Sequence, residues 1–198
     1  MGLIAVPNGD LATIVTTLEM TRRPPLRPVP PSPLRLVRWA EPTLARYRML
    51  FAQVGSPWLW YSRLVMADAD LAAILADPGV QVFAAVDPRG IEVGMVELDH
   101  RQPGEVRLAY FGLVPELAGQ GHGRWMMAET LARAWAPGVT RLSVCTCTLD
   151  HPSALGFYRA QGFTATSRTM ETFPDPRLSG TLPRDAAPQI PCLADRPA

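Results

Sequence analysis

The feature that most constrains the fold of this chain is the stretch from Val106 to Trp125, which reads VRLAYFGLVPELAGQGHGRW. Residues 106–114 are apolar and aromatic, which predicts a mostly buried strand. Pro115 should end that strand, because proline lacks the N–H group that the next ladder hydrogen bond needs. Three alternate glycines follow, and residues 124–135 then carry apolar side chains at helical spacing. The stretch therefore predicts a strand, a glycine loop and a helix in succession.

The glycine loop is predicted to hold a phosphate group. Glycines at these positions let the backbone turn sharply and keep side chains away from a ligand. The first N–H groups of a helix have no partner within it, and the helix dipole adds about half a positive charge there. Such a helix start is a natural pyrophosphate site. The predicted cofactor-binding residues of the loop are Gly119, Gln120, Gly121, His122, Gly123 and Arg124.

Two common phosphate-binding motifs do not fit this loop. A P-loop would need a lysine after its last glycine, and this chain contains no lysine at all. The dinucleotide fingerprint needs a third glycine where Met126 stands. A nicotinamide-binding oxidoreductase is therefore disfavoured.

A second motif lies further along the chain, where residues 153–163 read SALGFYRAQGF. This pattern predicts a helix with Tyr158 near its middle, followed by a strand that Gly162 and Phe163 open. The order of the two motifs resembles the GNAT superfamily of N-acetyltransferases, which use acetyl-CoA. The last two glycines of that family's pyrophosphate motif fall on Gly121 and Gly123. The motif begins with Arg or Gln, and here Ala118 stands there, which removes one side chain but leaves the backbone cradle.

The resemblance covers about residues 82–171 and implies an α/β (α+β) fold. It implies a mixed, splayed central β-sheet of about six to seven strands, with helices on both faces. Residues 34–173 should form this acyltransferase domain. Residues 1–33 should supply a first strand, at 10–20, and an extended proline-rich linker. Residues 174–198 read as a proline-rich tail, either disordered or laid over the domain or a neighbour.

The implied activity is direct transfer of an acetyl group from acetyl-CoA to a primary amine. The resemblance places Leu113 and Val114 at the pantetheine arm, with an N–H group there as oxyanion donor. His151 stands where the family often has an Asn that bonds the arm. Tyr158 matches the family's tyrosine and is the candidate acid for the leaving thiolate, because a phenol is protonated at neutral pH. The alternative function is a CoA-binding sensor or interaction module without catalysis.

The candidate base is Glu97, a carboxylate in a strand that otherwise reads as buried, which is often a functional arrangement. The alternative is that Glu97 is a structural charge paired with an arginine. Asp99, on the same face of the strand, and solvent are the other candidates for the base. Asp150 is expected to cap the following helix, although it has the alternative of orienting His151.

Three aromatic residues between the first two predicted helices have two interpretations. Trp58, Trp60 and Tyr61 either pack into the core or line the acceptor pocket, since that segment commonly forms the pocket wall in the family.

Composition narrows the partners. At 198 residues and a net charge of +1, the chain gives no electrostatic case for nucleic acid or an anionic membrane. No run of about 18 apolar residues indicates a membrane span, and nothing at the N-terminus resembles a secretory signal. The spacing of the three cysteines favours neither a disulfide framework nor a metal. We therefore expect a cytoplasmic enzyme with a small-molecule or peptide amine acceptor. The sequence selects no particular amine and leaves a homodimer open.

Overall fold

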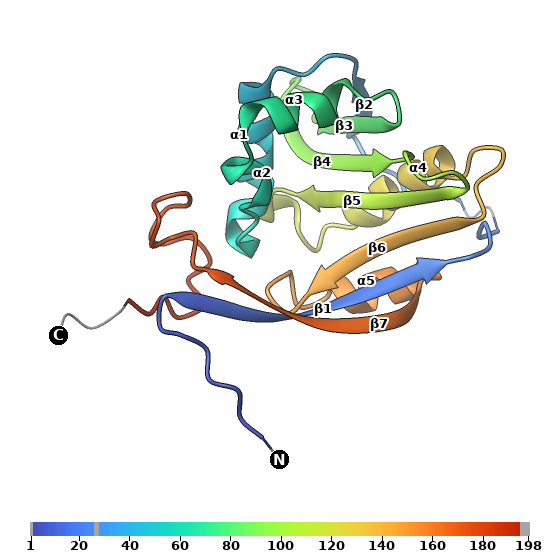
Figure 1. Ribbon diagram of the computed structural model, residues 1–198. Coiled ribbons are helices and arrows are strands. Elements are labelled where there is room, and N and C mark those ends of the chain that lie inside the picture. Colours follow the sequence, from blue (N-terminus) through green and yellow to red (C-terminus); the bar gives the residue numbers. More distant parts are fainter. Residues whose placement is uncertain (1, 26–27, 195–198) are drawn as a thin grey trace.

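The computed structural model describes residues 2–25 and 28–194, and it has the mixed α/β architecture that the sequence predicts (Figure 1). Seven strands form one sheet: β1 (Asp10–Met20), β2 (Arg35–Trp39), β3 (Val80–Val86), β4 (Glu92–Asp99), β5 (Glu105–Leu113), β6 (Arg141–Cys147) and β7 (Thr164–Pro174). The helices are α1 (Leu44–Gly55), α2 (Ser62–Val65), α3 (Asp68–Ala76), α4 (His122–Ala134) and α5 (Ala154–Ala160), with short 3₁₀ turns η1 (Ser56–Trp58) and η2 (Pro115–Leu117).

The strand order is β2-β3-β4-β5-β6-β1-β7. Strands β5 and β6 are parallel, and every other neighbouring pair in this sheet is antiparallel. The Asp87–Gly90 turn joins β3 and β4 into the hairpin that the sequence predicts. The position of β1 could not be read from the sequence, because it enters between β6 and β7, with Thr17 opposite both Cys145 and Ser167.

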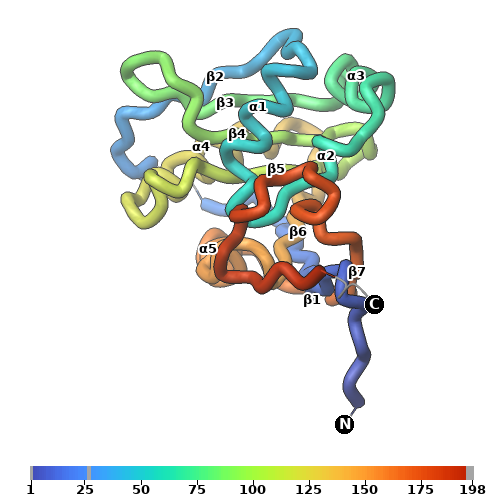
Figure 2. The backbone as a smooth tube through the Cα atoms, turned by 90° about the vertical axis from the view of Figure 1, so that its left-hand side faces the viewer, coloured from blue at the N-terminus to red at the C-terminus, as the bar shows by residue number. Residues whose placement is uncertain are grey.

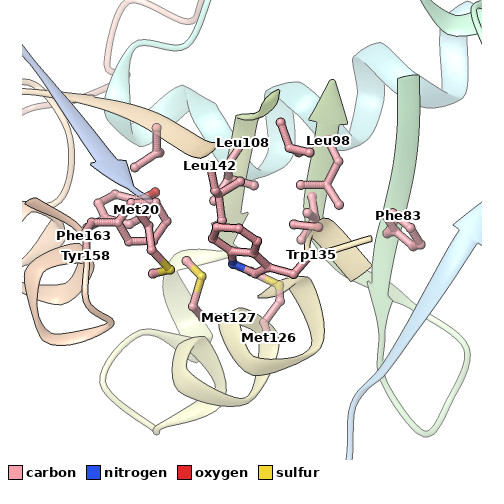
Figure 3. Close-up of a cluster of buried hydrophobic side chains, with 14 of the residues drawn as sticks. Met20, Phe83, Leu98, Leu108, Met126, Met127, Trp135, Leu142, Tyr158 and Phe163 are labelled. Atoms are coloured by element: carbon pink, nitrogen blue, oxygen red, sulfur yellow. The ribbon is translucent and has the colours of Figure 1, made fainter. Parts of the chain in front are cut away.

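Helices cover both faces of the sheet, and each face has its own apolar core. On one face, Trp125, Met126 and Met127 of α4 and Tyr158 of α5 pack against the strands. Figure 3 shows this cluster, with Tyr158 and Phe163 at one side and Trp135 near the middle. On the other face, α1 and α3 bury apolar side chains at helical spacing, namely Tyr47, Leu50, Phe51, Val54 and Leu71.

The sheet splays open between β5 and β6. Pairing of these strands runs only from Glu105 opposite Arg141 to Leu108 opposite Val144. At that point the β4–β5 register shifts, because Leu98 lies opposite Leu108 while Glu97 lies opposite Tyr110, which leaves an extra residue in β5. A bulge of this kind bends its strand and increases its twist. Beyond it the two strands diverge toward their carboxyl ends, as Figure 1 shows.

The proline-rich linker runs from β1 to β2 across the outer side of α4. Pro24, Pro28 and Pro30 line a groove together with Leu131 and Trp135 of the helix. Near its end, the Ser32 hydroxyl lies 3.1 Å from Nδ1 of His122, the first residue of α4. The linker is therefore packed on the domain, in contact with the start of the glycine-loop helix.

The C-terminal segment also packs on the domain over the part that the structure describes. Leu182 and Ala187 are buried against Leu59 and Phe173, and Figure 2 shows the segment, in red, at the same end of the molecule as α2. Its centre is a buried ion pair between Asp175 and Arg177, with 2.7 Å between Oδ2 and Nη2. The guanidinium also donates to backbone carbonyls of the segment, those of Ala186, Ala187, Ile190 and Pro191.

Replacing Arg177 by methionine should release the C-terminal segment. Removing one partner of a buried ion pair costs about 3–5 kcal/mol, because the other charge is left uncompensated. We expect amide hydrogen exchange over residues 178–190 to accelerate by more than about tenfold, the equivalent of 1.4 kcal/mol. Arg184, exposed in the same segment, supplies the matched control, and Arg184→Met should leave exchange unchanged. Equal exchange in both variants would mean that Arg177 does not hold the segment.

The same ion pair makes the segment sensitive to acid. Burial acts to raise the pKa of Asp175, but hydrogen bonds and attraction from Arg177 outweigh burial, so the pKa lies below its ordinary value. A lowered pKa in the folded state contributes stability above the ordinary pKa of about 3.9, which is lost as pH falls through the folded value. The protection factors of these amides in the parent protein, which are corrected for the intrinsic pH dependence of exchange, should therefore fall only below about pH 4.

Candidate active site

A cavity of about 330 Å³ occupies the splay between β5 and β6. Its walls come from residues 109–113 of β5, the loop and first turns of α4, and the start of α5. Trp58 and Trp60 close it on the side of η1. Strand and helix ends that lie far apart in the sequence thus meet at one place, because the sheet opens there.

The glycine loop has the geometry of an anion cradle. Gly119 and Gly121 have φ values of +75° and +86°, which side-chain-bearing residues rarely adopt. Gly123 lies in the first turn of α4, and a Cβ atom there would meet nothing closer than the Phe157 ring at 3.8 Å. Both Gly119 and Gly123 line the cavity, so the helix start faces open space.

The other three loop residues differ in their contacts. Gln120 donates from its side chain to the carbonyl of Glu116 at 2.7 Å, which stabilises the loop itself. His122 contacts the linker through Ser32. Arg124 is exposed and lines the linker groove, and its guanidinium lies 3.7 Å from the position of a Cβ on Gly121. Arg124 therefore brings a cationic side chain close to this helix start.

Of the two strand residues predicted at the pantetheine arm, only Leu113 lines the cavity. The N–H group of Val114 donates to Val93 O at 2.9 Å, so it is used within the sheet. Successive N–H groups of a strand point to opposite sides. The N–H group of Leu113 therefore points toward β6, into the splay, which narrows the expected oxyanion donor to Leu113.

Tyr158 lines the cavity, with its ring packed among Phe111, Phe157 and Phe163. Burial raises the pKa of Tyr158, and the nearby Asp150 and Cys145 raise it further. The phenol is only 7% exposed and lines the cavity, so it is held protonated against the space that a thioester would enter.

Asp150 and His151 both line the cavity. Asp150 does not have the helix-capping role that the sequence favoured. Its Oδ2 accepts from the Cys147 N–H at 2.9 Å and from the Thr146 hydroxyl at 2.8 Å, so it holds the turn after β6. The residue that caps α5 is Ser153, so the helix-cap prediction for Asp150 was wrong. His151 Nδ1 accepts from the Ser153 N–H at 3.1 Å, which leaves Nε2 as the donor in the neutral ring.

Glu97, the predicted base, lies in a buried network beside the cavity. It is 1% exposed, its Oε1 is 2.6 Å from Nη2 of Arg63, and its Oε2 accepts from the Tyr47 hydroxyl at 2.5 Å. Glu97 is not among the described residues that line the cavity. Its nearest link to that space is indirect, since the Arg63 guanidinium lies over the ring of Tyr110, which does line it. This placement favours the structural alternative, a charge paired with an arginine.

Asp99, the second candidate base, lies at the end of β4 and pairs with Arg101, with 2.6 Å between Oδ2 and Nη2. The hydrogen bonds from Arg101 lower the pKa of Asp99. It is likewise not among the described residues of the cavity wall.

The three aromatic residues of the η1 segment divide between the two interpretations. Trp58 and Trp60 line the cavity, whereas Tyr61 stacks on Phe173 at 4.9 Å, outside it.

Two glycines that the sequence analysis did not single out allow the position of Trp60. A Cβ on Gly55 would lie 2.4 Å from the Trp60 side chain, and one on Gly112 would lie 3.2 Å from its ring and 2.6 Å from Val54. A glycine inside a strand, as at Gly112, is the sequence signal for such close approach.

The comparisons with known proteins agree with this geometry. Residues 38–163 match the family model described as the acetyltransferase (GNAT) family. No curated protein sequence matches the chain.

Several solved structures share the fold at low sequence identity. A functionally unknown conserved protein from Staphylococcus epidermidis has 12% identity and a TM-score of 0.59 over 84% of this chain and 63% of its own. A GCN5-related N-acetyltransferase from Sphaerobacter thermophilus has 16% identity and a TM-score of 0.57 over 82% and 51%. An aminoglycoside acetyltransferase from an uncultured soil metagenomic sample, in complex with sisomicin, has 18% identity and a TM-score of 0.55 over 68% and 91%. The chain thus spans less than two thirds of the first two proteins.

Two further observations concern residues 2–25 and 28–194. Within these ranges no helix is both long and apolar enough to cross a membrane. The same residues contain no group of three or more His, Cys, Asp or Glu side chains placed to hold a metal ion.

Substitution of Glu97 by glutamine distinguishes its two interpretations. If Glu97 is structural, Glu97→Gln leaves the Arg63 charge without its buried partner and lowers the free energy of unfolding by about 3–5 kcal/mol. Any remaining activity should then keep the parent's pH profile. Turnover reduced by about 10²–10⁴, with a smaller loss at high pH and unchanged stability, would instead identify Glu97 as the base. Urea denaturation and a pH–rate series measure both.

Substitution of Gly123 by valine tests the cradle without straining the backbone. Gly123 has an ordinary helical conformation with room for a side chain, unlike Gly121, so Gly123→Val should fold normally. The added methyl groups would occupy the space before the helix start, and we expect acetyl-CoA affinity to fall by more than about tenfold. Gly156, an exposed glycine inside α5 with nothing within 4 Å, supplies the matched control Gly156→Val. Calorimetry showing equal affinity for both variants would place the cradle elsewhere.

Proposed function

This chain belongs to the acetyltransferase (GNAT) family, an acyltransferase family that uses acetyl-CoA, and we propose that it transfers the acetyl group directly to a primary amine. The observation that carries this proposal is the convergence of three features on one cavity. They are the glycine cradle at the start of α4, the outward N–H group of Leu113 and the hydroxyl of Tyr158. Direct transfer needs donors for the phosphates, for the carbonyl oxygen and for the leaving sulfur, and these residues are of the required types.

The residues of the cavity fit the cosubstrate. The N–H groups at residues 119–123 and the Arg124 guanidinium would hold its pyrophosphate, with no Cβ at Gly119 or Gly123 to obstruct it, while the Arg124 N–H is used by Gly121 O at 3.1 Å. The backbone of residues 109–113 on the open side of β5 would bond the amides of the pantetheine arm. These hydrogen bonds would satisfy the N–H and C=O groups of β5 that β6 leaves unpaired. When bound, the thioester supplies the activated acetyl group.

Bond making and bond breaking can then be assigned to named groups. The amine nitrogen forms a bond to the acetyl carbon while the C–S bond breaks, and that electron pair goes to sulfur. The Leu113 N–H would stabilise the charge on the carbonyl oxygen, and the Tyr158 hydroxyl would protonate the sulfur. The proton lost by the amine passes to Asp150, the carboxylate that lines the cavity, or to water. When the product leaves, that proton returns to the phenolate of Tyr158.

A thiol-release assay against a panel of amines tests the proposal. Acetyl-CoA should bind, and at least one primary amine should release free CoA with formation of its N-acetyl product. Binding of acetyl-CoA without thiol release for any amine would instead support a CoA-binding module without catalysis. Two features favour this second function, namely the departure at Ala118 in the pyrophosphate motif and the position of the predicted base, Glu97, outside the cavity wall.

Substitution of Tyr158 by phenylalanine should reduce kcat and leave acetyl-CoA affinity unchanged. The ring keeps its contacts with Phe111 and Phe163, so stability should change little. The hydroxyl acts on a charge that exists only as the C–S bond breaks, and its loss should reduce kcat by about 10²-fold or more. Because burial raises the pKa of Tyr158, the parent's activity should show no loss from deprotonation of this phenol up to about pH 10.

Two observations check the assignment of Tyr158. A thioester with a better leaving thiol should recover part of the rate of Tyr158→Phe, because that sulfur needs less help to depart. A variant that turns over acetyl-CoA as fast as the parent would make Tyr158 a packing residue.

A further inference from the structure

The outer end of the cavity has a composition of its own. We call the outer end the part of the wall formed by Trp58, Trp60, Tyr110, Asp150 and His151, which lie against one another and do not belong to the glycine loop. These side chains are left for the acceptor if the glycine loop and the edge of β5 hold the cosubstrate, as proposed above. The chemistry of these five side chains therefore bears on the class of acceptor.

The aromatic wall is rigidly held. Trp60 packs on Phe51 and Tyr110, with ring centroids at 5.5 and 5.3 Å, in the space that Gly55 and Gly112 leave free. A wall that is fixed before binding costs less conformational entropy when a ligand arrives.

Trp58 presents a second ring opposite the loop that carries His151, with the two ring centroids 5.2 Å apart at an angle of 67°. The loop that bears Trp58 is fixed from outside by the C-terminal segment, because Gln189 donates to Pro57 O at 3.1 Å. The outer end of the cavity is thus lined by two indole rings held at defined positions.

The charge at this end is a single carboxylate. Asp150 is the one acidic residue among the described cavity residues, and these include no arginine. Its Oδ2 is used by Thr146 and Cys147, while its Oδ1 has only the Trp60 Nε1–H, at a long 3.4 Å. Oδ1 of Asp150 therefore keeps capacity to bind a cation, beside the N–H edge of Trp60.

We propose, building on the acetyl transfer proposed above, that the acceptor is a monocationic amine carried on a flat aromatic group, an arylalkylamine. Its ring would lie against Trp58 and Trp60, and its ammonium would meet Oδ1 of Asp150 and lose one proton to water before the nitrogen attacks. A polyamine or an aminoglycoside carries several ammonium groups, and this wall supplies only one carboxylate to pair with them. The remaining ammonium groups would have no partner in the wall. An aliphatic amine would fill the space without using the π-faces.

The panel for the test contains 2-phenylethylamine and tryptamine, with octylamine, spermidine and sisomicin as the aliphatic and polycationic comparisons. We expect kcat/KM for the two aromatic amines to exceed that for each comparison amine by roughly tenfold or more. The binding of 2-phenylethylamine in the presence of CoA, measured by calorimetry, gives a readout that does not depend on turnover.

Variants at Trp58 connect the preference to the aromatic wall. Trp58→Leu keeps an apolar side chain but removes the ring, and it should raise KM for 2-phenylethylamine by roughly tenfold with little change for octylamine. Trp58→Phe restores a flat ring and should recover most of the parent's KM. Acetyl-CoA affinity is measured for all three proteins, so that a change in KM for the amine can be told from a change in cosubstrate binding through His151, whose ring centroid lies 5.2 Å from that of Trp58.

The outcomes separate this inference from the acetyl transfer itself. Preferred turnover of spermidine, sisomicin or octylamine would overturn the aromatic acceptor and leave acetyl transfer standing. The same holds if Trp58→Leu affects octylamine and 2-phenylethylamine alike. Acetyl-CoA binding with neither thiol release nor calorimetric binding of the aromatic amines would overturn both.

Discussion

The site depends on hydrogen bonds that β5 and β6 do not make with each other. Their ladder ends at Leu108 and Val144, where the bulge in β5 turns the strand away. A buried strand edge must satisfy its N–H and C=O groups somewhere. In this fold the unpaired backbone groups face a cavity. The point at which the β5–β6 ladder ends is therefore also the point at which backbone groups are free to bind a ligand. The cradle of α4 and the tyrosine of α5 are useful because they border this opening.

Two buried ion pairs stabilise the walls of the opening from behind. Arg63 and Glu97 fix the layer beneath Tyr110 on one face of the sheet. Asp175 and Arg177 organise the C-terminal segment, which in turn contacts the loop of Trp58. Buried pairs of this kind are weak contributors to net stability compared with apolar packing, but they are costly to break singly. Here each pair holds the side chains around it, whose other neighbours are apolar, in a single arrangement.

The sequence predicted the elements whose signals are local. The strand, glycine loop and helix at 106–135 and the tyrosine helix appear where expected, because proline, glycine and helical spacing act over a few residues. The sequence could not assign Glu97, since a carboxylate in an apolar strand looks the same whether Arg63 meets it or solvent does. It also missed the fit of Trp60 against Gly55 and Gly112, which are far from each other along the chain. The backbone of the cradle was therefore easier to predict than the side chains around the acceptor space.

The place of β1 between β6 and β7 gives this chain a particular order of assembly. The first strand to be synthesised pairs with residues about 128 positions later, as the contact between Thr17 and Cys145 illustrates. Contacts of such long sequence separation are slow to form, because a large loop must close before they add stability. Until then β6 and β7 have no strand between them, and the tyrosine helix that connects them has no finished sheet beneath it. Ligand binding in this protein should thus be acquired late in folding, after synthesis of the whole domain.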